Sequence, residues 1–99
     1  MRTVIFFARA KRDLDDIWAY IAVDNLTAAD RFVEDVGCAV QDLAVMPGLG
    51  HRRPDVSDPR YRFWSVKKHL IAYRHTSRTL RVVRIVHGAR DIRKVFDQS

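Results

Sequence analysis

The stretch HLIAYRHTSRTLRVVRIVH, residues 69–87, decides the fold of this chain. It contains two runs rich in β-branched and other apolar residues, His69 to His75 and Leu80 to His87, with a polar turn near Ser77-Arg78 between them. Runs of this length and composition, bounded by polar residues, are typical of β-strands. The stretch therefore predicts two neighbouring strands joined by a short turn.

Two further strands are predicted outside this stretch. The run from Arg60 to Val66 comes directly before it and ends at a turn near Lys67-Lys68. Near the start of the chain, Thr3 to Phe7 is a β-branched and aromatic run that is typical of a buried strand. Neither turn has the Asn-Gly type of sequence that tight hairpins prefer, so the pattern leaves the register of the strands open.

The first of two predicted helices extends from about Ala8 to Ala22. Apolar residues recur there at helical spacing, at Leu14, Ile17, Trp18 and Ile21. Asp13, Asp15 and Asp16 lie towards its start, where the helix dipole favours negative charge.

The second predicted helix carries an apolar stripe from Ala29 to Leu43. Thr27 followed by Asp30 resembles a capping box at its start. The helix must end by Met46, because Pro47 cannot extend it. Cys38 lies within this helix and is expected to be a small core residue.

These elements predict an α+β domain with the order β-α-α-β-β-β-α. An antiparallel sheet of about four strands carries the N-terminal αα-hairpin on one face, and a short C-terminal helix is expected over residues 89–98. With 99 residues, the chain is expected to form a single domain over residues 1–99.

Apolar residues on both faces of the predicted sheet raise the question of what covers the second face. Strict alternation assigns one face to Leu70, Ala72, Val83 and Ile85, and the other to Ile71, Tyr73, Val82 and Val86. The hairpin can cover only one of them. An open second face predicts a docking site for another chain; alternatively, the terminal helix and the loop over residues 47–59 cover it.

The charge is distributed unevenly along the chain. The net charge is +6, but residues 1–50 carry −3 and residues 51–99 carry +9. Fourteen of the eighteen basic residues are arginine, whose planar group pairs with carboxylates or phosphates. The partner is therefore expected to be acidic, either a protein segment or a nucleic acid.

The sequence also indicates a cytoplasmic protein with no cofactor. No apolar run approaches the roughly 20 residues that a membrane span needs, and no leader is recognisable at the start. Because Cys38 is the only cysteine, neither an internal disulfide nor a zinc-binding thiol cluster is expected.

Motifs spread along nearly the whole chain resemble the ParE-type toxins of the RelE/ParE superfamily. The closing string from His87 to Asp91 and the pattern of the first helix are the most specific of them. The residues that carry the resemblance are Ala10, Asp13-Leu14, Ile17, Tyr20-Ile21-Ala22, Ala29, Phe32, Leu43, Pro47, Gly50, Arg60, Arg62, Leu70-Ile71-Ala72-Tyr73-Arg74 and Val83-Arg84-Ile85-Val86-His87-Gly88-Ala89-Arg90-Asp91.

The resemblance implies the toxin of a two-component toxin–antitoxin module. A ParD-like antitoxin is expected to hold it inactive in a higher-order hetero-oligomer. ParE toxins act on DNA gyrase, whereas their RelE-type relatives cut messenger RNA on the ribosome. No catalytic residue is assigned, because an inhibitor that works by binding needs no nucleophile.

Two sets of residues are candidates for these contacts. The expected target-binding residues are Arg84, His87, Arg90 and Arg93. The expected antitoxin-binding residues are Trp18, Arg62, Trp64, Tyr73 and Arg74.

Two other functions stay open at this point. A ribosome-dependent nuclease could use His87 with Phe96, because histidine side chains in general have pKa values near neutrality. However, many RelE-type nucleases have a tyrosine after the last strand, and all three tyrosines of this chain precede that strand.

A plain nucleic-acid-binding module is the other alternative. Base-reading and stacking motifs are missing from the sequence, so sequence-specific binding to nucleic acid is not expected.

Overall fold

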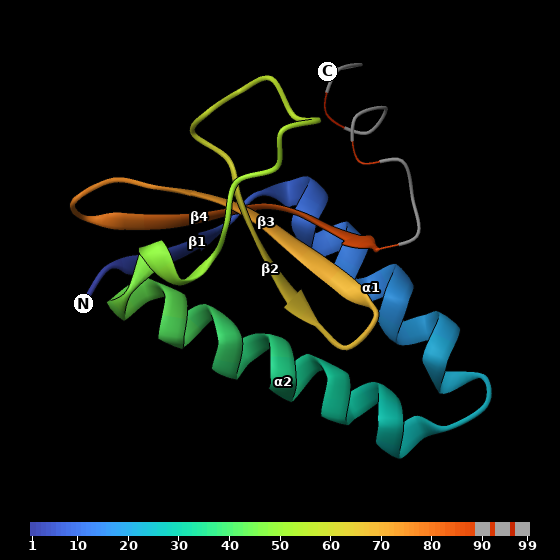
Figure 1. Ribbon diagram of the computed structural model, residues 1–99. Helices are drawn as coiled ribbons and strands as arrows, with labels where there is room; N and C mark the ends of the chain where they lie inside the picture. The colour runs from blue at the N-terminus through green and yellow to red at the C-terminus, as the bar shows by residue number, and fades with distance from the viewer. Residues whose placement is uncertain (89–91, 93–95, 97–99) are drawn as a thin grey trace.

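The computed structural model describes residues 1–88, 92 and 96, and shows an α+β fold around one four-strand sheet (Figure 1). Its elements are β1 (Thr3–Phe6), α1 (Ala8–Ala22), α2 (Leu26–Val45), the 3-10 helix η1 (Pro47–Leu49), β2 (Arg62–Val66), β3 (His69–His75) and β4 (Thr79–His87). The predicted order is confirmed as far as β4. The terminal helix predicted over residues 89–98 lies outside the described residues, apart from Ile92 and Phe96.

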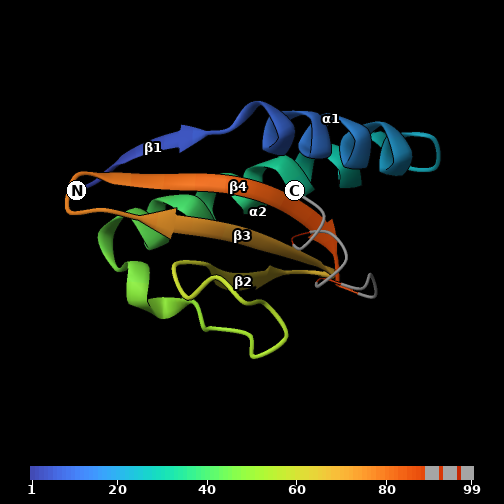
Figure 2. The same ribbon diagram turned by 90° about the horizontal axis from the view of Figure 1, so that it is seen from above.

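The sheet is mixed rather than antiparallel throughout. Its strand order is β1-β4-β3-β2, as the view from above shows (Figure 2). The last three strands form an antiparallel meander, but β1 pairs with β4 in parallel because the helical hairpin, not a tight turn, connects β1 to the meander. This position at the sheet edge leaves Ile5 39% exposed, so the expectation of a buried first strand is wrong.

Helix α1 has the predicted bounds, whereas α2 begins differently from the expectation. The side chain of Asn25 caps α2 by accepting a hydrogen bond of 2.9 Å from the backbone N–H of Ala28. Because Asn25 takes the N-cap position, the capping box predicted at Thr27 does not form. Among the described residues, no helix is both long enough and apolar enough to cross a membrane.

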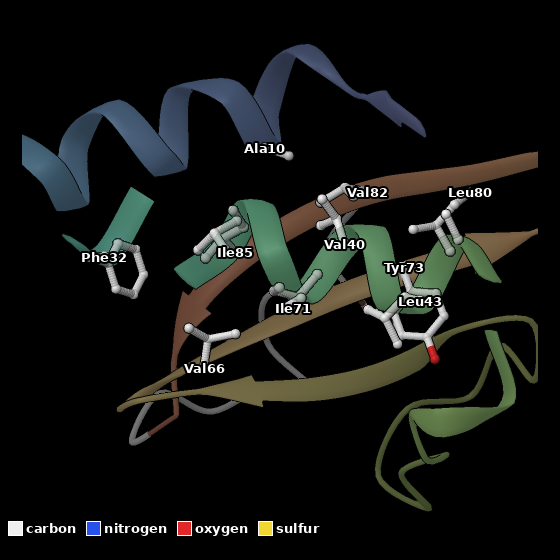
Figure 3. Close-up of a cluster of buried hydrophobic side chains, with 13 residues drawn as sticks. Ala10, Phe32, Val40, Leu43, Val66, Ile71, Tyr73, Leu80, Val82 and Ile85 are labelled. Atoms are coloured by element: carbon white, nitrogen blue, oxygen red, sulfur yellow. The ribbon is translucent and has the colours of Figure 1, made fainter. Parts of the chain in front are cut away.

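The face of the sheet that carries the helices contains the larger of two core clusters (Figure 3). Its members are Ala10, Phe32, Val36, Ala39, Val40, Leu43, Ala44, Val66, Ile71, Tyr73, Leu80, Val82 and Ile85. The stripe of α2 that faces this cluster leaves Cys38 on the solvent side, so the expectation of a buried cysteine is wrong.

A bulge in β4 changes which side chains share a face. Ala72 pairs with Arg84 and Tyr73 pairs with Val82, which leaves Val83 as an extra residue. Strict alternation therefore fails at this point. Val82 and Ile85 both pack towards the helices, and Val86 packs on the opposite face, in contrast to the predicted grouping.

The second face of the sheet is covered by other parts of the same chain. Figure 1 shows the loop between η1 and β2 on the side of the sheet opposite α2. Val56 from this loop and Ile92 pack on that face in the second core cluster, together with Phe63, Leu70, Ala72 and Val86. The apolar part of this face is therefore not an open docking site, because the loop and, among the described residues after β4, Ile92 and Phe96 cover it, as the alternative expected.

Tyr73 attaches the end of α2 and η1 to the sheet. Its buried hydroxyl donates a hydrogen bond to the carbonyl of Pro47 and accepts one of 2.9 Å from the N–H of Gly50. The ring approaches so closely that a Cβ at Gly50 would lie 2.2 Å from the hydroxyl oxygen. The position therefore requires glycine for steric reasons.

Replacing Tyr73 by phenylalanine is expected to lower the free energy of unfolding by about 1–3 kcal/mol, because two buried backbone groups lose their partner. Urea denaturation followed by circular dichroism measures this change. Tyr20→Phe is the matched control, since Tyr20 is 82% exposed. Equal stability of Tyr73→Phe and the parent chain would contradict a role for the hydroxyl.

Candidate functional site

Helix α1 is attached to β4 through the carboxylate of Asp13. Strand β1 pairs with β4 only as far as Val82, so beyond that residue α1 takes the place of a strand beside β4. Asp13 accepts a hydrogen bond of 3.0 Å from the N–H of Ile85, and bonds of 2.7 and 3.2 Å from the Nε and Nη2 atoms of Arg84. The buried carboxylate is thus paired with both a cation and a backbone donor.

The interaction of Asp13 with the helix dipole, which the sequence suggested, is not its main role. Asp13 lies beyond the first turn of α1, and that turn contains no acidic residue. The sequence does indicate the buried position of Asp13, because this residue follows Ala10 by three residues and precedes Ile17 by four. This spacing places a carboxylate on the apolar side of an amphipathic helix, where it needs a partner.

A groove of about 770 Å³ opens beside this contact. The second half of α1 and the first half of α2 form its walls, and the β2–β3 turn closes it against the ends of β3 and β4. Its volume lies within the usual range of ligand pockets. The lining residues are Asp16, Ile17, Tyr20, Ile21, Ala28, Arg31, Phe32, Asp35, Lys67, Lys68, His69 and His87.

The helical side of the groove carries apolar residues that are incompletely buried. Ile17 and Ile21 pack only partly against the core, and Tyr20 is 82% exposed. The turn between the two helices adds Val23 and Leu26 as further exposed apolar residues. Large apolar groups gathered at one site on a surface are typical of protein–protein contacts.

Basic residues predominate among the charged groups that line the groove. The basic residues in the lining are Arg31, Lys67 and Lys68, and the acidic ones are Asp16 and Asp35. The only ion pair recorded among these five is 3.9 Å long, between the Nζ atom of Lys67 and Asp35, and both side chains are exposed. An exposed ion pair of this kind contributes about 0–1 kcal/mol to stability. Lys67 and Asp35 can therefore give up this pair to contact a partner protein at little cost in free energy.

Two histidines from adjacent strands lie at the sheet end of the groove. His69 and His87 are register partners, and their ring centroids are 5.2 Å apart. Burial, with a smaller effect of His87, lowers the pKa of His69, whose Nδ1 atom is buried and has no hydrogen-bond partner in the described structure. Within residues 1–88, 92 and 96, no three His, Cys, Asp or Glu side chains gather in a group that could hold a metal ion.

Of the four predicted target-binding residues, the structure places His87 in the groove. Arg84 is held by Asp13, and its side chain is only 15% exposed. Arg90 and Arg93 lie outside the described residues. A contact between these four residues and a target stays a prediction.

The five predicted antitoxin-binding residues, Trp18, Arg62, Trp64, Tyr73 and Arg74, do not form one surface. Trp18 lies on the hairpin, where its Nε1 atom donates to Asp30. Arg62 donates to the carbonyl of Gly50, and Trp64 is half-buried against the helix-side core. Tyr73 is fully buried, and Arg74 contacts Tyr61 on the opposite face.

Sequence reasoning did not identify the groove because its lining comes from four separate elements. Tyr20 offered one signal, since a large aromatic residue beside Ile21 but off the buried stripe remains at the surface. The adjacent Lys67-Lys68 was recognised only as a turn. Their shared location depends on packing of α1 and α2 against the sheet, which no local pattern encodes.

The fold is that of the RelE/ParE-like structural class. A structure titled "Chromosomal ParDE TA system from P. aeruginosa" matches with a TM-score of 0.71 at 22% identity, covering 88% of this chain and 96% of that one. The E. coli DinJ-YafQ complex matches with a TM-score of 0.55 at 15% identity, covering 90% and 96%. At these identities the likeness shows the fold alone.

Sequence comparison adds the family. The family described as "ParE toxin of type II toxin-antitoxin system, parDE" matches residues 4–92. A Sinorhizobium fredii protein described as "Putative toxin Y4kP" is 37% identical over 80 residues, which is 81% of either chain. The chain belongs to the ParE toxin family, and the resemblance found in the sequence is confirmed.

The lowered pKa of His69 predicts that acid destabilises the fold. The unfolded chain takes up a proton near the ordinary histidine pKa of about 6.5, whereas the folded chain takes it up at lower pH. The free energy of unfolding should therefore fall as the pH drops from about 7 to about 5. His75, whose pKa is lowered chiefly by burial, acts in the same direction.

Urea denaturation at several pH values measures this dependence. A His69→Phe variant should lose part of the acid sensitivity, whereas a His51→Gln variant should keep it. An unchanged pH profile in His69→Phe would show that this imidazole does not carry the effect.

Proposed function

We propose that this chain is the toxin of a parDE-type module, that it inhibits DNA gyrase, and that its antitoxin neutralises it by occupying the groove. Membership of the ParE toxin family supports the first part. The observation that carries the antitoxin site is the groove, with its exposed apolar helix side and its basic lining.

The ion pairs of two arginines agree with a toxin that acts by binding its target and not by cleaving RNA. Cleavage of RNA needs an acid and a base with cations near the reacting phosphate. Arg84 is paired with Asp13, and Arg60 forms an ion pair of 2.7 Å with Asp58. Two of the arginines that a nuclease could use are therefore engaged in ion pairs within the chain, Arg84 largely buried and Arg60 at the surface.

The groove fits an antitoxin segment that is both apolar and acidic. Apolar side chains would pack between Tyr20, Ile17 and Ile21, and carboxylates would meet Lys67 and Lys68 at the opposite side. A segment that is disordered when free and folds on binding suits such a site, because it can follow the two helices over a large area. The partner implied is thus a ParD-like antitoxin with an acidic, apolar recognition segment.

The same geometry supplies a steric mechanism of neutralisation. His87, a candidate contact with the target, lines the groove together with the proposed antitoxin contacts. An antitoxin seated there covers His87 directly. Antitoxin and gyrase then compete for one end of the sheet, and no conformational change is needed to inactivate the toxin.

Purified protein added to DNA gyrase and relaxed plasmid should inhibit supercoiling or accumulate cleaved DNA. Adding the antitoxin in excess should restore supercoiling. Agarose gel electrophoresis of the plasmid measures both effects. Normal supercoiling at saturating toxin would contradict the proposed target.

The nuclease alternative is tested in parallel by primer extension on translated messages during growth arrest. Intact messages are expected. Codon-linked cuts that disappear in a His87→Ala variant would instead assign the chain to ribosome-dependent RNA cleavage.

Truncating Tyr20 to alanine should weaken antitoxin binding about tenfold or more, because aromatic residues at the centre of an interface carry much of its affinity. Titration calorimetry with the cognate antitoxin measures the change. Val45→Ala is the matched control, since Val45 is 60% exposed on the same hairpin but does not line the groove. Equal losses for the two variants would argue against the groove as the binding site.

A further inference from the structure

Two arginines of like charge lie opposite each other on the sheet face that points away from the helices. Arg74 of β3 and Arg81 of β4 are register partners. Arg74 contacts Tyr61, which packs against the second core cluster, so the pair belongs to that face. Like charges directly opposite each other destabilise a sheet. Among the described residues, no ion pair or side-chain hydrogen bond compensates either guanidinium.

The guanidinium of Arg74 is held in place by two aromatic rings. Its central carbon lies 5.6 Å from the centroid of Phe7 and 5.6 Å from that of Tyr61. Cation–π contacts at this distance fix a guanidinium without using its N–H donors. The Nε atom of Arg74 is nevertheless buried and has no hydrogen-bond partner within the described structure. A buried donor of this kind normally has a hydrogen-bond partner.

Two of the three arginines in the loop between η1 and β2 are already paired with carboxylates. Arg60 pairs with Asp58, and Arg53 pairs with Asp55 at 3.0 Å. Asp58 also lies within electrostatic range of Arg74, although Arg60 is the main cause of its lowered pKa of about 2. Among the described residues, Arg74 and Arg81 are therefore two cations without an ion pair that the strand register brings side by side on this face.

We propose that Arg74 and Arg81 together bind one carboxylate from an acidic segment of a partner protein. Guanidinium groups suit this role because their planar N–H donors match a carboxylate in a bidentate arrangement. Ile5, the register partner of Arg81 on its other side, is 39% exposed and offers an apolar contact for the stem of the acidic side chain.

A nucleic acid fits this site less well than a protein carboxylate. Binding of single strands relies on aromatic faces for stacking and on a continuous basic groove. Here the ring of Tyr61 is engaged by Arg74 and by Phe96, whose centroid is 4.9 Å away. Arg53 and Arg60 of the loop are each paired with an aspartate and are not available to extend a basic groove. The site also lies across the sheet from the groove assigned to the antitoxin, so both can be occupied together.

The test is a titration followed by NMR of the arginine Nε–Hε resonances in the full chain. The probes are a blocked Leu-Glu-Leu peptide, its Leu-Gln-Leu counterpart and a short oligothymidylate. The Glu peptide should shift the Arg74 resonance saturably and the Gln peptide should not. Arg74→Gln or Arg81→Gln should weaken binding about tenfold, because a charge-assisted hydrogen bond is lost.

Arg78→Gln is the matched control, since it removes the same charge from the exposed turn between β3 and β4. It should leave the affinity for the Glu peptide within about twofold of the parent chain, the size of an exposed single-charge effect. The dispersion of the amide spectrum verifies that each variant is folded. Equal shifts with both peptides, equal losses in all three variants, or saturable binding of oligothymidylate alone would overturn the proposal. None of these outcomes depends on gyrase inhibition.

Discussion

The carboxylate of Asp13 fixes helix α1 to the sheet, and the groove depends on that attachment. Ala10 and Asp13 are the fully buried residues of α1, whereas its apolar residues Leu14, Ile17 and Ile21 pack against the core and stay partly exposed. Breaking a buried ion pair by removing one partner costs about 3–5 kcal/mol, because the other charge stays buried without compensation. The bond from Ile85 adds a backbone donor to the same carboxylate. One side chain thus sets the wall opposite α2.

This mode of attachment agrees with the incomplete burial of the second half of α1. A helix held by a polar contact near its start does not need to close its other end over the core. Ile17 and Ile21 consequently stay half-buried, and Tyr20 faces solvent beside them. The apolar area that α1 leaves exposed is available for a partner, and binding that partner would complete the burial that the isolated chain lacks.

The features that could be predicted from the sequence are those with a local cause. The bounds of α1 and β3 follow from apolar periodicity, and Pro47 ends α2 by its own geometry. The features that could not be predicted have long-range causes. The bulge at Val83 exchanges the faces of Ile85 and Val86, and the partner of Asp13 is 71 residues away. For the same reason, of the site candidates that the structure describes, His87 is the one that lines the groove.

The two surfaces of the toxin should respond differently to salt. If the antitoxin binds in the groove as proposed, its affinity would depend mainly on the apolar residues around Tyr20, because burial of apolar area is insensitive to ionic strength at physiological concentrations. At Arg74 and Arg81 the attraction is electrostatic and partly exposed, so dissolved ions screen it. A partner that binds through the arginine pair alone would therefore dissociate at a salt concentration that an antitoxin in the groove tolerates. Since the two surfaces lie on opposite faces of the sheet, occupation of the groove does not block the arginine pair sterically.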